Sequence, residues 1–192
     1  MNRAFACVFA ALMVLGCVGK AQAQEMDTRS LFSGGPSLFQ GGGGSSPIPR
    51  TTVSYDSTYA PGTIVVNTAE RRLYLVLANG QALRYGIGVG RDGFRWGGTH
   101  RISAKKEWPD WTPPSQMLAR RPDLPRHMKG GIDNPLGARA MYLGSTLYRI
   151  HGSNEPETIG QAVSSGCFRM TNDDVTDLYG RVSVGTTVVV KN

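Results

Sequence analysis

Short runs rich in apolar and β-branched residues recur along the chain, a pattern typical of β-strands, and in residues 99–105 apolar and polar positions alternate. The runs cover residues 63–67, 73–77, 82–85, 99–105, 140–143, 147–150 and 186–190. Asn79-Gly80 separates the second run from the third, and an Asn-Gly pair in that position is the strongest short signal for a β-hairpin. The pattern therefore predicts a mainly β fold, either a β-sandwich or an open barrel.

Helical signals are few and short. We expect one helix over residues 115–120 and another that is capped by Thr171 or Asn172 and ends at Gly180. The capping-box spacing of Thr158 and Gln161 predicts a further helical turn. The glycines of residues 86–90 tempt one to predict a phosphate-binding loop, but the full fingerprint is missing and no helix follows. We interpret them as a strand with bulges.

An irregular segment, residues 107–135, interrupts the strand pattern. It is rich in proline and also contains Trp108 and Trp111. Long insertions between strands are usually either functional or disordered, and two tryptophans among prolines argue against disorder. We therefore expect a structured flap over a cleft. Its basic residues either attract carboxylates or form a solvated face, and they are Arg120, Arg121, Arg126 and Lys129.

The N-terminal residues 1–23 have the features of a secretory signal peptide. Arg3 precedes an apolar run too short to span a membrane, and a small-residue cleavage site ends at Ala23. We expect export to the periplasm or cell envelope, with lipidation of Cys17 as the alternative. Residues 24–60, rich in Gly, Ser and Pro, predict a flexible leader, and residues 61–192 the folded domain.

Export makes the cysteine content informative. Of the three cysteines, only Cys167 lies outside the predicted signal peptide. A lone cysteine in an oxidising compartment suggests a reactive thiol or an intermolecular disulfide, and a small buried hydrophobic residue is the alternative. Loss of Arg3 and Lys20 lowers the net charge from +7 to +5. This charge favours carboxylate-bearing partners, whereas export and the scattering of basic residues argue against nucleic acid.

Cys167 and His151 together predict thiol chemistry. Histidine removes a proton from a thiol well, and His151 comes at the exit of a predicted strand. The backbone amides of Gly166 and Cys167 are candidates for an oxyanion hole. A metal site is the alternative, but the spacing of its candidate ligands is not typical of zinc, so we expect neither metal nor cofactor. Those candidates are His100, His127, His151 and Cys167.

The segment around these residues resembles the active-site signature of the L,D-transpeptidase catalytic domain family, also called the YkuD family. The resemblance rests on His151-Gly152 and on residues 164–170, and it covers about residues 61–191. Secondary motifs of that family are also similar to residues 86–90, 111–114 and 134–137. The resemblance implies a β-rich sandwich and an enzyme that remodels peptidoglycan in the cell envelope.

The resemblance also implies roles for individual residues. Cys167 would attack the bond before the terminal D-alanine of a tetrapeptide stem and form a thioester, which an amine of another stem or of an anchored envelope protein would resolve. His151 would be the base, oriented by a backbone carbonyl near Gly152 or Ser153. Carbapenems would acylate Cys167. The candidate substrate-binding residues are Arg169, Ser164, Ser165, Trp111 and Tyr142.

Several alternatives stay open at the level of sequence. Arg169 either grips a stem carboxylate or pairs with Asp173 or Asp174. Ser165 stands where many family members have a histidine, and Phe168 replaces a more usual aliphatic residue. The same thiol chemistry with water as acceptor would give an L,D-carboxypeptidase or an endopeptidase. The other alternative is a non-catalytic peptidoglycan-binding module in which Cys167 is structural.

Overall fold

The structure is a computed structural model that describes residues 46–192. Its strands are β1 Thr51–Ser54, β2 Ile64–Asn67, β3 Arg72–Val76, β4 Gln81–Gly86, β5 Val89–Gly90, β6 Gly98–Glu107, β7 Arg139–Leu143, β8 Arg149–His151, β9 Ala162–Ser164, β10 Phe168–Arg169 and β11 Thr187–Lys191. Its helices are α1 Ser115–Arg120, the 3₁₀ turn η2 Pro156–Thr158, and α2 Asn172–Arg181. The mainly β prediction is confirmed.

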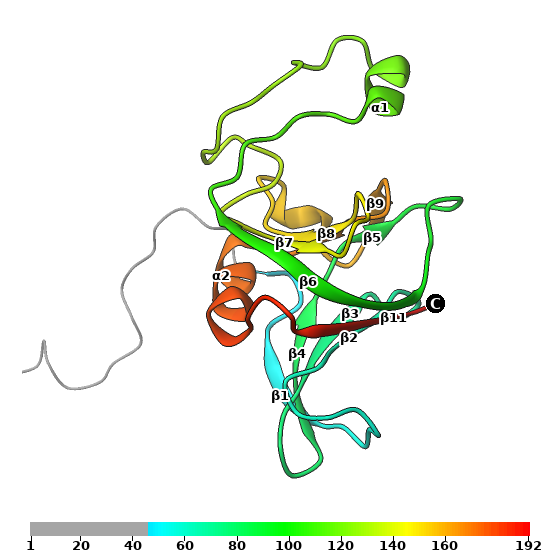
Figure 1. Cartoon of the computed structure of the whole chain (residues 1–192), viewed down its shortest axis with the longest axis vertical. Coiled ribbons are helices and arrows are strands. Elements are labelled where there is room, and N and C mark those ends of the chain that lie inside the picture. The colour runs from blue at the N-terminus through cyan, green and yellow to red at the C-terminus, as the bar shows by residue number, and fades with distance from the viewer. Residues whose placement is uncertain (1–45) are drawn as a thin grey trace, which may run out of the picture. The chain divides into compact units, whose positions relative to one another are not determined.

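One long strand, β6, belongs to both layers of the fold. Residues 98–101 pair with β11, and the remainder pairs with β7 after a register shift between Ile102 and Ala104. Such a bulge bends the strand and turns the sheet. The strand order is β1-β4-β3-β2-β11-β6-β7-β8-β10, and β5 pairs with β9 beside it. In Figure 1, β6 crosses the molecule between β7 and β8 on one side and β11, β2 and β3 on the other.

The two halves of this sheet enclose one core. Ile64 and Leu73 of the first half share a cluster of buried side chains with Met141 and Ile150 of the second. The predicted hairpin is confirmed, because β3 and β4 pair around Asn79-Gly80, both of which have positive φ, as a tight hairpin turn requires. These contacts make a β-sandwich whose second half carries His151.

Helix α2 closes one end of the core. Val175 and Leu178 are fully buried, and the Thr171 hydroxyl accepts a hydrogen bond from Asp174 N–H at 3.2 Å. The prediction of a helix capped by Thr171 is therefore confirmed. The prediction of a helical turn that begins at Thr158 is wrong. A 3₁₀ turn starting at Pro156 ends there instead, and the Thr158 hydroxyl donates to Glu155 O at 2.7 Å.

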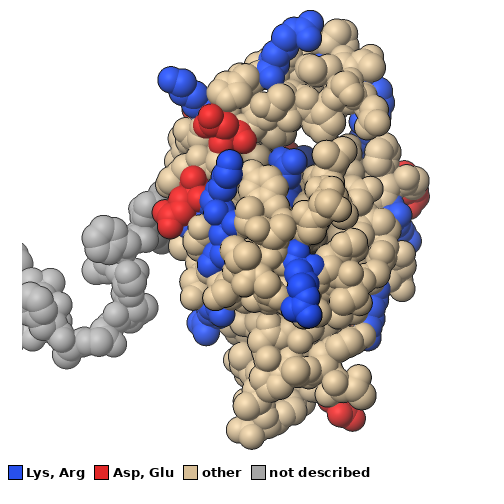
Figure 2. Space-filling model, viewed as in Figure 1, with Lys and Arg blue, Asp and Glu red and all other residues tan. Residues whose placement is uncertain are grey.

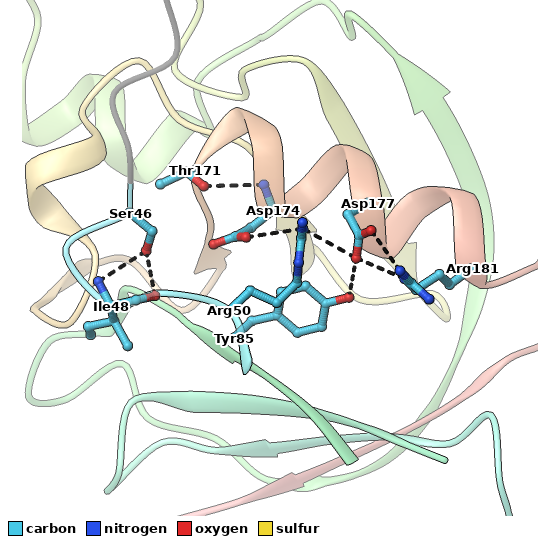
Figure 3. A network of polar contacts seen from close by, with 8 residues as sticks. All are labelled: Ser46, Ile48, Arg50, Tyr85, Thr171, Asp174, Asp177 and Arg181. Carbon is cyan, nitrogen blue, oxygen red and sulfur yellow. Dashed lines mark hydrogen bonds and ion pairs between the residues drawn. The ribbon is translucent and has the colours of Figure 1, made fainter. Parts of the chain in front are cut away.

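The segment directly before β1, residues 46–50, contacts α2 (Figure 3). We call it the strap. The Arg50 guanidinium lies 3.3 Å from both Asp174 Oδ1 and Asp177 Oδ2, and Asp177 also accepts a 2.6 Å hydrogen bond from the Tyr85 hydroxyl. Ile48 occupies the space beside Gly86, where an added Cβ would lie 2.6 Å from the Ile48 Cβ. The strap is thus part of the folded domain.

The strap and β1 correct the predicted leader of residues 24–60. β1 pairs with β4 along its whole length, from Thr51 opposite Arg84 to Ser54 opposite Gln81. Composition predicts flexibility, but the pairing of β1 with β4 and the ion pairs of Arg50 stabilise this stretch. The rest of the predicted leader up to residue 45 and the predicted signal peptide lie outside the described residues. Within residues 46–192, no helix is long and apolar enough to cross a membrane.

The expected flap is present between β6 and β7. Its two legs meet at a short neck, where Trp111 and Met128 exchange two backbone hydrogen bonds of 2.8 Å. Asp110 also accepts a 2.8 Å hydrogen bond from Gly130 N–H. Helix α1 matches its predicted bounds and buries none of its residues. In Figure 1 the flap projects from the sheet with α1 at its far end.

Candidate active site

The nucleophile turn, residues 164–167, has a geometry set by side chains on both sides. The Ser164 hydroxyl donates to Cys167 O at 2.6 Å and accepts from Gly166 N–H at 3.1 Å. Gly166 has φ of +111°, and a Cβ there would overlap the Tyr148 ring. Glycine is therefore required on two grounds. Because Ser164 already binds the Gly166 amide, our expectation that this amide serves an oxyanion hole is not met, and the Cys167 amide is left as the candidate.

His151 ends β8 and is held by strands on both sides. It pairs with Ala140 of β7 and with Arg169 of β10, and only 5% of it is exposed. Its Nδ1 lies 2.6 Å from Gly152 O. A carbonyl oxygen only accepts hydrogen bonds, so Nδ1 carries the ring proton and Nε2 keeps its lone pair. Burial, with the nearby Arg169 charge, lowers the pKa of His151 to about 3, so the ring is neutral at pH 7.

Gly152 is itself tightly placed. Its N–H donates to Arg139 O at 3.0 Å, and a Cβ on it would overlap the Asn172 side chain. Asn172 Oδ1 in turn accepts from Ala138 N–H at 2.8 Å. The carbonyl that orients the imidazole is therefore fixed by the first residue of α2 and by β7. This is the third partner that the resemblance placed near Gly152 or Ser153.

The Cys167 thiol faces the same cleft as His151 and is partly exposed. Its Sγ lies 3.9 Å from Leu147 O, a weak hydrogen bond. Burial raises the pKa of Cys167, and the Arg149 and Arg169 charges oppose that shift in part. The thiol is therefore protonated at rest, and a base must take its proton before it reacts.

The cleft has a volume of about 700 Å³ and lies under the flap. The flap residues Trp111, Met117 and Leu124 form its apolar side, and Figure 2 shows the flap arching over a hollow. Five arginines line it against only two carboxylates. The charged lining residues are Arg91, Arg120, Arg121, Arg149, Arg169, Asp133 and Glu155. A cleft with this excess of positive charge attracts anionic groups.

Most of the predicted substrate-binding residues line this cleft. They are Trp111, Ser164, Ser165 and Arg169. Arg169 pairs with Glu155 at 2.8 Å, so the expected alternative of Asp173 or Asp174 is wrong, and Asp174 pairs with Arg50 instead. Of the basic flap residues, Arg120 and Arg121 are in the lining.

The structure does not bring Tyr142 into the cleft. Its neighbours Met141 and Leu143 point into the core, so by the two-residue period of a strand Tyr142 points outward. It lies opposite Arg149 in the β7–β8 ladder, and the Arg149 guanidinium sits 5.2 Å from its ring. Tyr142 lines a separate, shallow hollow with Ser103 and Lys106.

Several residues that contact the site were missed by sequence reasoning. Leu147, Tyr148 and Arg149 line the cleft, and Trp96 contacts the nucleophile turn from outside the lining. The tyrosine and arginine lie three and two positions before His151, and the sequence pattern assigns them only to a strand. No signal in the sequence distinguishes Trp96. As for metal, residues 46–192 contain no group of three or more His, Cys, Asp or Glu side chains placed to hold an ion.

Fold and site together define a class: β-sandwich proteins in which a cysteine and a neutral, carbonyl-oriented histidine face one cleft under an inserted flap. The chain belongs to one family of that class, the L,D-transpeptidase catalytic domain family (YkuD), whose model matches residues 61–190. The predicted family is thus confirmed. The strap and β1 precede the matched segment.

Curated relatives carry names of the same kind. The probable L,D-transpeptidase YbiS of Escherichia coli K12 is 37% identical over 150 residues, which cover 73% of this chain and 47% of YbiS. The probable L,D-transpeptidase ErfK/SrfK of the same strain is 40% identical over 136 residues, covering 66% of this chain and 43% of that protein. The chain spans about half the length of these relatives.

Solved structures support the fold. An L,D-transpeptidase from Mycobacterium smegmatis matches with a TM-score of 0.56 at 19% identity, over 69% of this chain and 59% of that one. A Brucella melitensis structure, titled a probable carnitine operon oxidoreductase, is 47% identical with a TM-score of 0.52, over 77% of this chain and 96% of that one. That title names a different activity, and the family assignment here rests on the family model and the curated relatives.

Proposed function

We propose that this protein is a cysteine-dependent L,D-transpeptidase that acts on the tetrapeptide stems of peptidoglycan. The observation that carries the proposal is that a thiol, Cys167, and a neutral imidazole, His151, face one arginine-lined cleft in a chain from the L,D-transpeptidase family. The proposed place of action is the cell envelope, where the substrate lies.

In the first half of the reaction, His151 Nε2 takes the proton of the Cys167 thiol as Sγ attacks the carbonyl before the terminal D-alanine. The neutral ring with its proton on Nδ1 suits this task, because only Nε2 has a lone pair. The Gly152 carbonyl then stabilises the imidazolium that forms. The imidazolium gives its proton to the departing D-alanine amine, and a thioester remains on Cys167.

In the second half, an amine attacks the thioester and His151 accepts its proton. The amine belongs to another stem or to an anchored envelope protein, and collapse of the tetrahedral intermediate returns the thiol. Water in place of the amine would give hydrolysis. The choice of acceptor therefore depends on what the cleft admits beside Cys167.

The charge of the cleft suits the proposed substrate. Peptide stems carry carboxylates, and two arginines line the cleft, Arg120 on the flap side and Arg149 on the sheet side. Arg169 is held at 2.8 Å by Glu155 and contributes charge from a fixed position. We also propose that carbapenems acylate Cys167. One structural neighbour, of Mycobacterium tuberculosis, is titled as holding a faropenem-derived adduct, and another L,D-transpeptidase as a complex with imipenem.

The decisive experiment incubates the protein and its Cys167→Ala variant with purified disaccharide-tetrapeptide and separates the products by mass spectrometry. We expect dimers formed with loss of D-alanine, and none with Cys167→Ala. Monomeric tripeptide without dimers, again dependent on Cys167, would assign an L,D-carboxypeptidase. Turnover that survives in Cys167→Ala, or no turnover at all, would overturn the thiol mechanism, and the latter would favour the binding-module alternative.

A further inference from the structure

A tryptophan outside the cleft lining contacts the backbone of the nucleophile turn. Trp96 lies in the connection between β5 and β6 and is half-buried against the core. Its indole Nε1–H donates to Gly166 O at 2.7 Å. Trp96 is not among the residues that line the cleft, whereas Cys167 is, so the hydrogen bond reaches the turn from outside the cleft lining.

The position of the indole is fixed by aromatic neighbours. Its ring stacks on Tyr148 with 4.4 Å between centroids and 7° between planes, and it packs at 5.2 Å against Phe168. Tyr148 also fills the space beside Gly166 that any side chain there would need. Two stacked aromatic residues therefore act on Gly166. Tyr148 excludes a side chain at position 166, and Trp96 donates a hydrogen bond to the Gly166 carbonyl.

Because the peptide bond is planar, the hydrogen bond from Trp96 to Gly166 O also affects the orientation of the Cys167 N–H. In a trans peptide the C=O of Gly166 and the N–H of Cys167 share one plane and point in opposite directions. A donor that holds the carbonyl on the Trp96 side thus directs the Cys167 N–H away from Trp96. The turn and loop hydrogen bonds within residues 46–192 include none donated by this N–H, whereas the Gly166 N–H is taken by Ser164.

We infer that Trp96 is a positioning residue that orients the Gly166–Cys167 peptide so that the Cys167 amide donates to the oxyanion formed during acyl transfer. The inference rests on the proposed thiol mechanism. When Sγ bonds to the substrate carbonyl carbon, the carbonyl electron pair moves to oxygen, and the Cys167 N–H stabilises that charge. No bond to Trp96 forms or breaks. Trp96 acts only through Gly166.

The test compares two reactions of the same thiol. Acylation by imipenem passes through an oxyanion, whereas alkylation by iodoacetamide does not, and both are followed by the mass of the intact protein. The variants are Trp96→Phe, which keeps an aromatic ring, and a protein with 3-benzothienylalanine at position 96, which keeps the ring size and replaces N–H by sulfur. His100→Val is the matched control, because His100 contacts the edge of the same indole at 5.1 Å without a hydrogen bond to it.

We expect acylation of both position-96 variants to slow by roughly 10- to 100-fold, somewhat less than the loss of a whole oxyanion donor. Alkylation should stay within about twofold, and His100→Val should resemble the unmodified protein in both reactions. Equal slowing of both reactions, or acylation at the unmodified rate in the benzothienyl protein, would overturn the inference. If the unmodified protein is acylated but forms no dimers from tetrapeptide, the proposed function fails and the inference is still decided by these rates.

Discussion

The nucleophile turn and the flap both border the cleft, but they are stabilised in opposite ways. The turn is held by Ser164 from within, by Tyr148 against Gly166 and by Trp96 on the carbonyl. The flap is joined to the sheet through a neck around the Trp111–Met128 bridge, and its helix α1 buries no residue. Segments with few buried contacts open most readily. The reacting groups therefore lie on the rigid side of the cleft, and the adaptable surface lies on the other side.

The largest effect on turnover is expected from a substitution in the nucleophile turn, on the rigid side of the cleft. Gly166→Ala should lower turnover at least about 100-fold, because a side chain there overlaps Tyr148 and misplaces Cys167. A non-glycine residue at this positive φ should also cost about 1–3 kcal/mol of stability. Steady-state kinetics and the thermal unfolding midpoint measure the two effects.

Gly131→Ala in the flap is the matched control, since a Cβ there meets nothing within 4 Å. It should change turnover by less than about twofold. The contrast between turn and flap would fail if both alanine variants behaved alike.

The next prediction concerns the pH dependence of kcat/KM, which reports the protonation of His151 on the rigid side of the cleft. Because burial lowers the pKa of His151 to about 3, the free base persists in acid, whereas a histidine with the ordinary value of 6.5 would be only about 3% unprotonated at pH 5. We therefore expect kcat/KM to be nearly constant from pH 7 to pH 5. An acid limb centred near 6.5 would contradict the burial of His151.

The same pKa has a consequence for stability. A folded-state pKa below the unfolded value means that the unfolded chain binds more protons between pH 6.5 and about 3. The contribution of His151 is thus fully present above 6.5 and is lost as the pH falls toward 3. Urea unfolding at several pH values should show less acid destabilisation in His151→Gln than in the unmodified protein.

A smaller effect is expected at the flap neck. Gly130→Ala places a Cβ against the Trp108 carbonyl, a backbone atom that cannot turn aside, so the neck must shift. We expect kcat/KM to fall about tenfold, as for hinge changes remote from the chemistry. The alkylation rate of Cys167 should not change, because the turn is held independently. Parallel loss of both rates would show that flap and turn are coupled.

The smallest effect concerns charge on the flap. Arg120→Ala removes one guanidinium from the cleft and should raise KM about two- to fivefold, with kcat unchanged, since exposed charges contribute only about 0.2–1 kcal/mol. The difference should fade at high salt. Arg126→Ala, outside the cleft lining, is the control. An unchanged KM in Arg120→Ala would show that Arg120 does not take part in stem recognition.

What the sequence predicted well depends on local interactions. The Asn79-Gly80 turn sets its own backbone angles and the register of its hairpin, and Thr171 caps α2 from an adjacent position. Cys167 and His151 were identified by residue type and by their family motif. Their meeting in one cleft depends on the parallel pairing of β10 with β8, which no local pattern encodes.

What the sequence did not predict depends on contacts between distant positions. Arg50 and Asp174 form an ion pair, and their sequence neighbourhoods give no sign of it, so composition alone places the strap in the leader. Trp96 is 70 positions from Gly166 and has no motif of its own. The prediction of a helical turn beginning at Thr158 was wrong for the opposite reason. It rested on a short local capping pattern, whereas Pro156 favours a tight turn just before Thr158.

The packing of Ile48 has a consequence for how related sequences vary. Gly86 and Gly160 both adjoin Ile48. Gly160 has φ of +88°, which favours glycine whatever the space around it. Gly86 has no positive φ, and only the side chains of Ile48 and Ile159 exclude a larger residue there. Position 160 should therefore stay glycine in any lineage that keeps this turn. Position 86 should accept larger residues in lineages where residue 48 has become small, so that positions 48 and 86 covary while 160 does not.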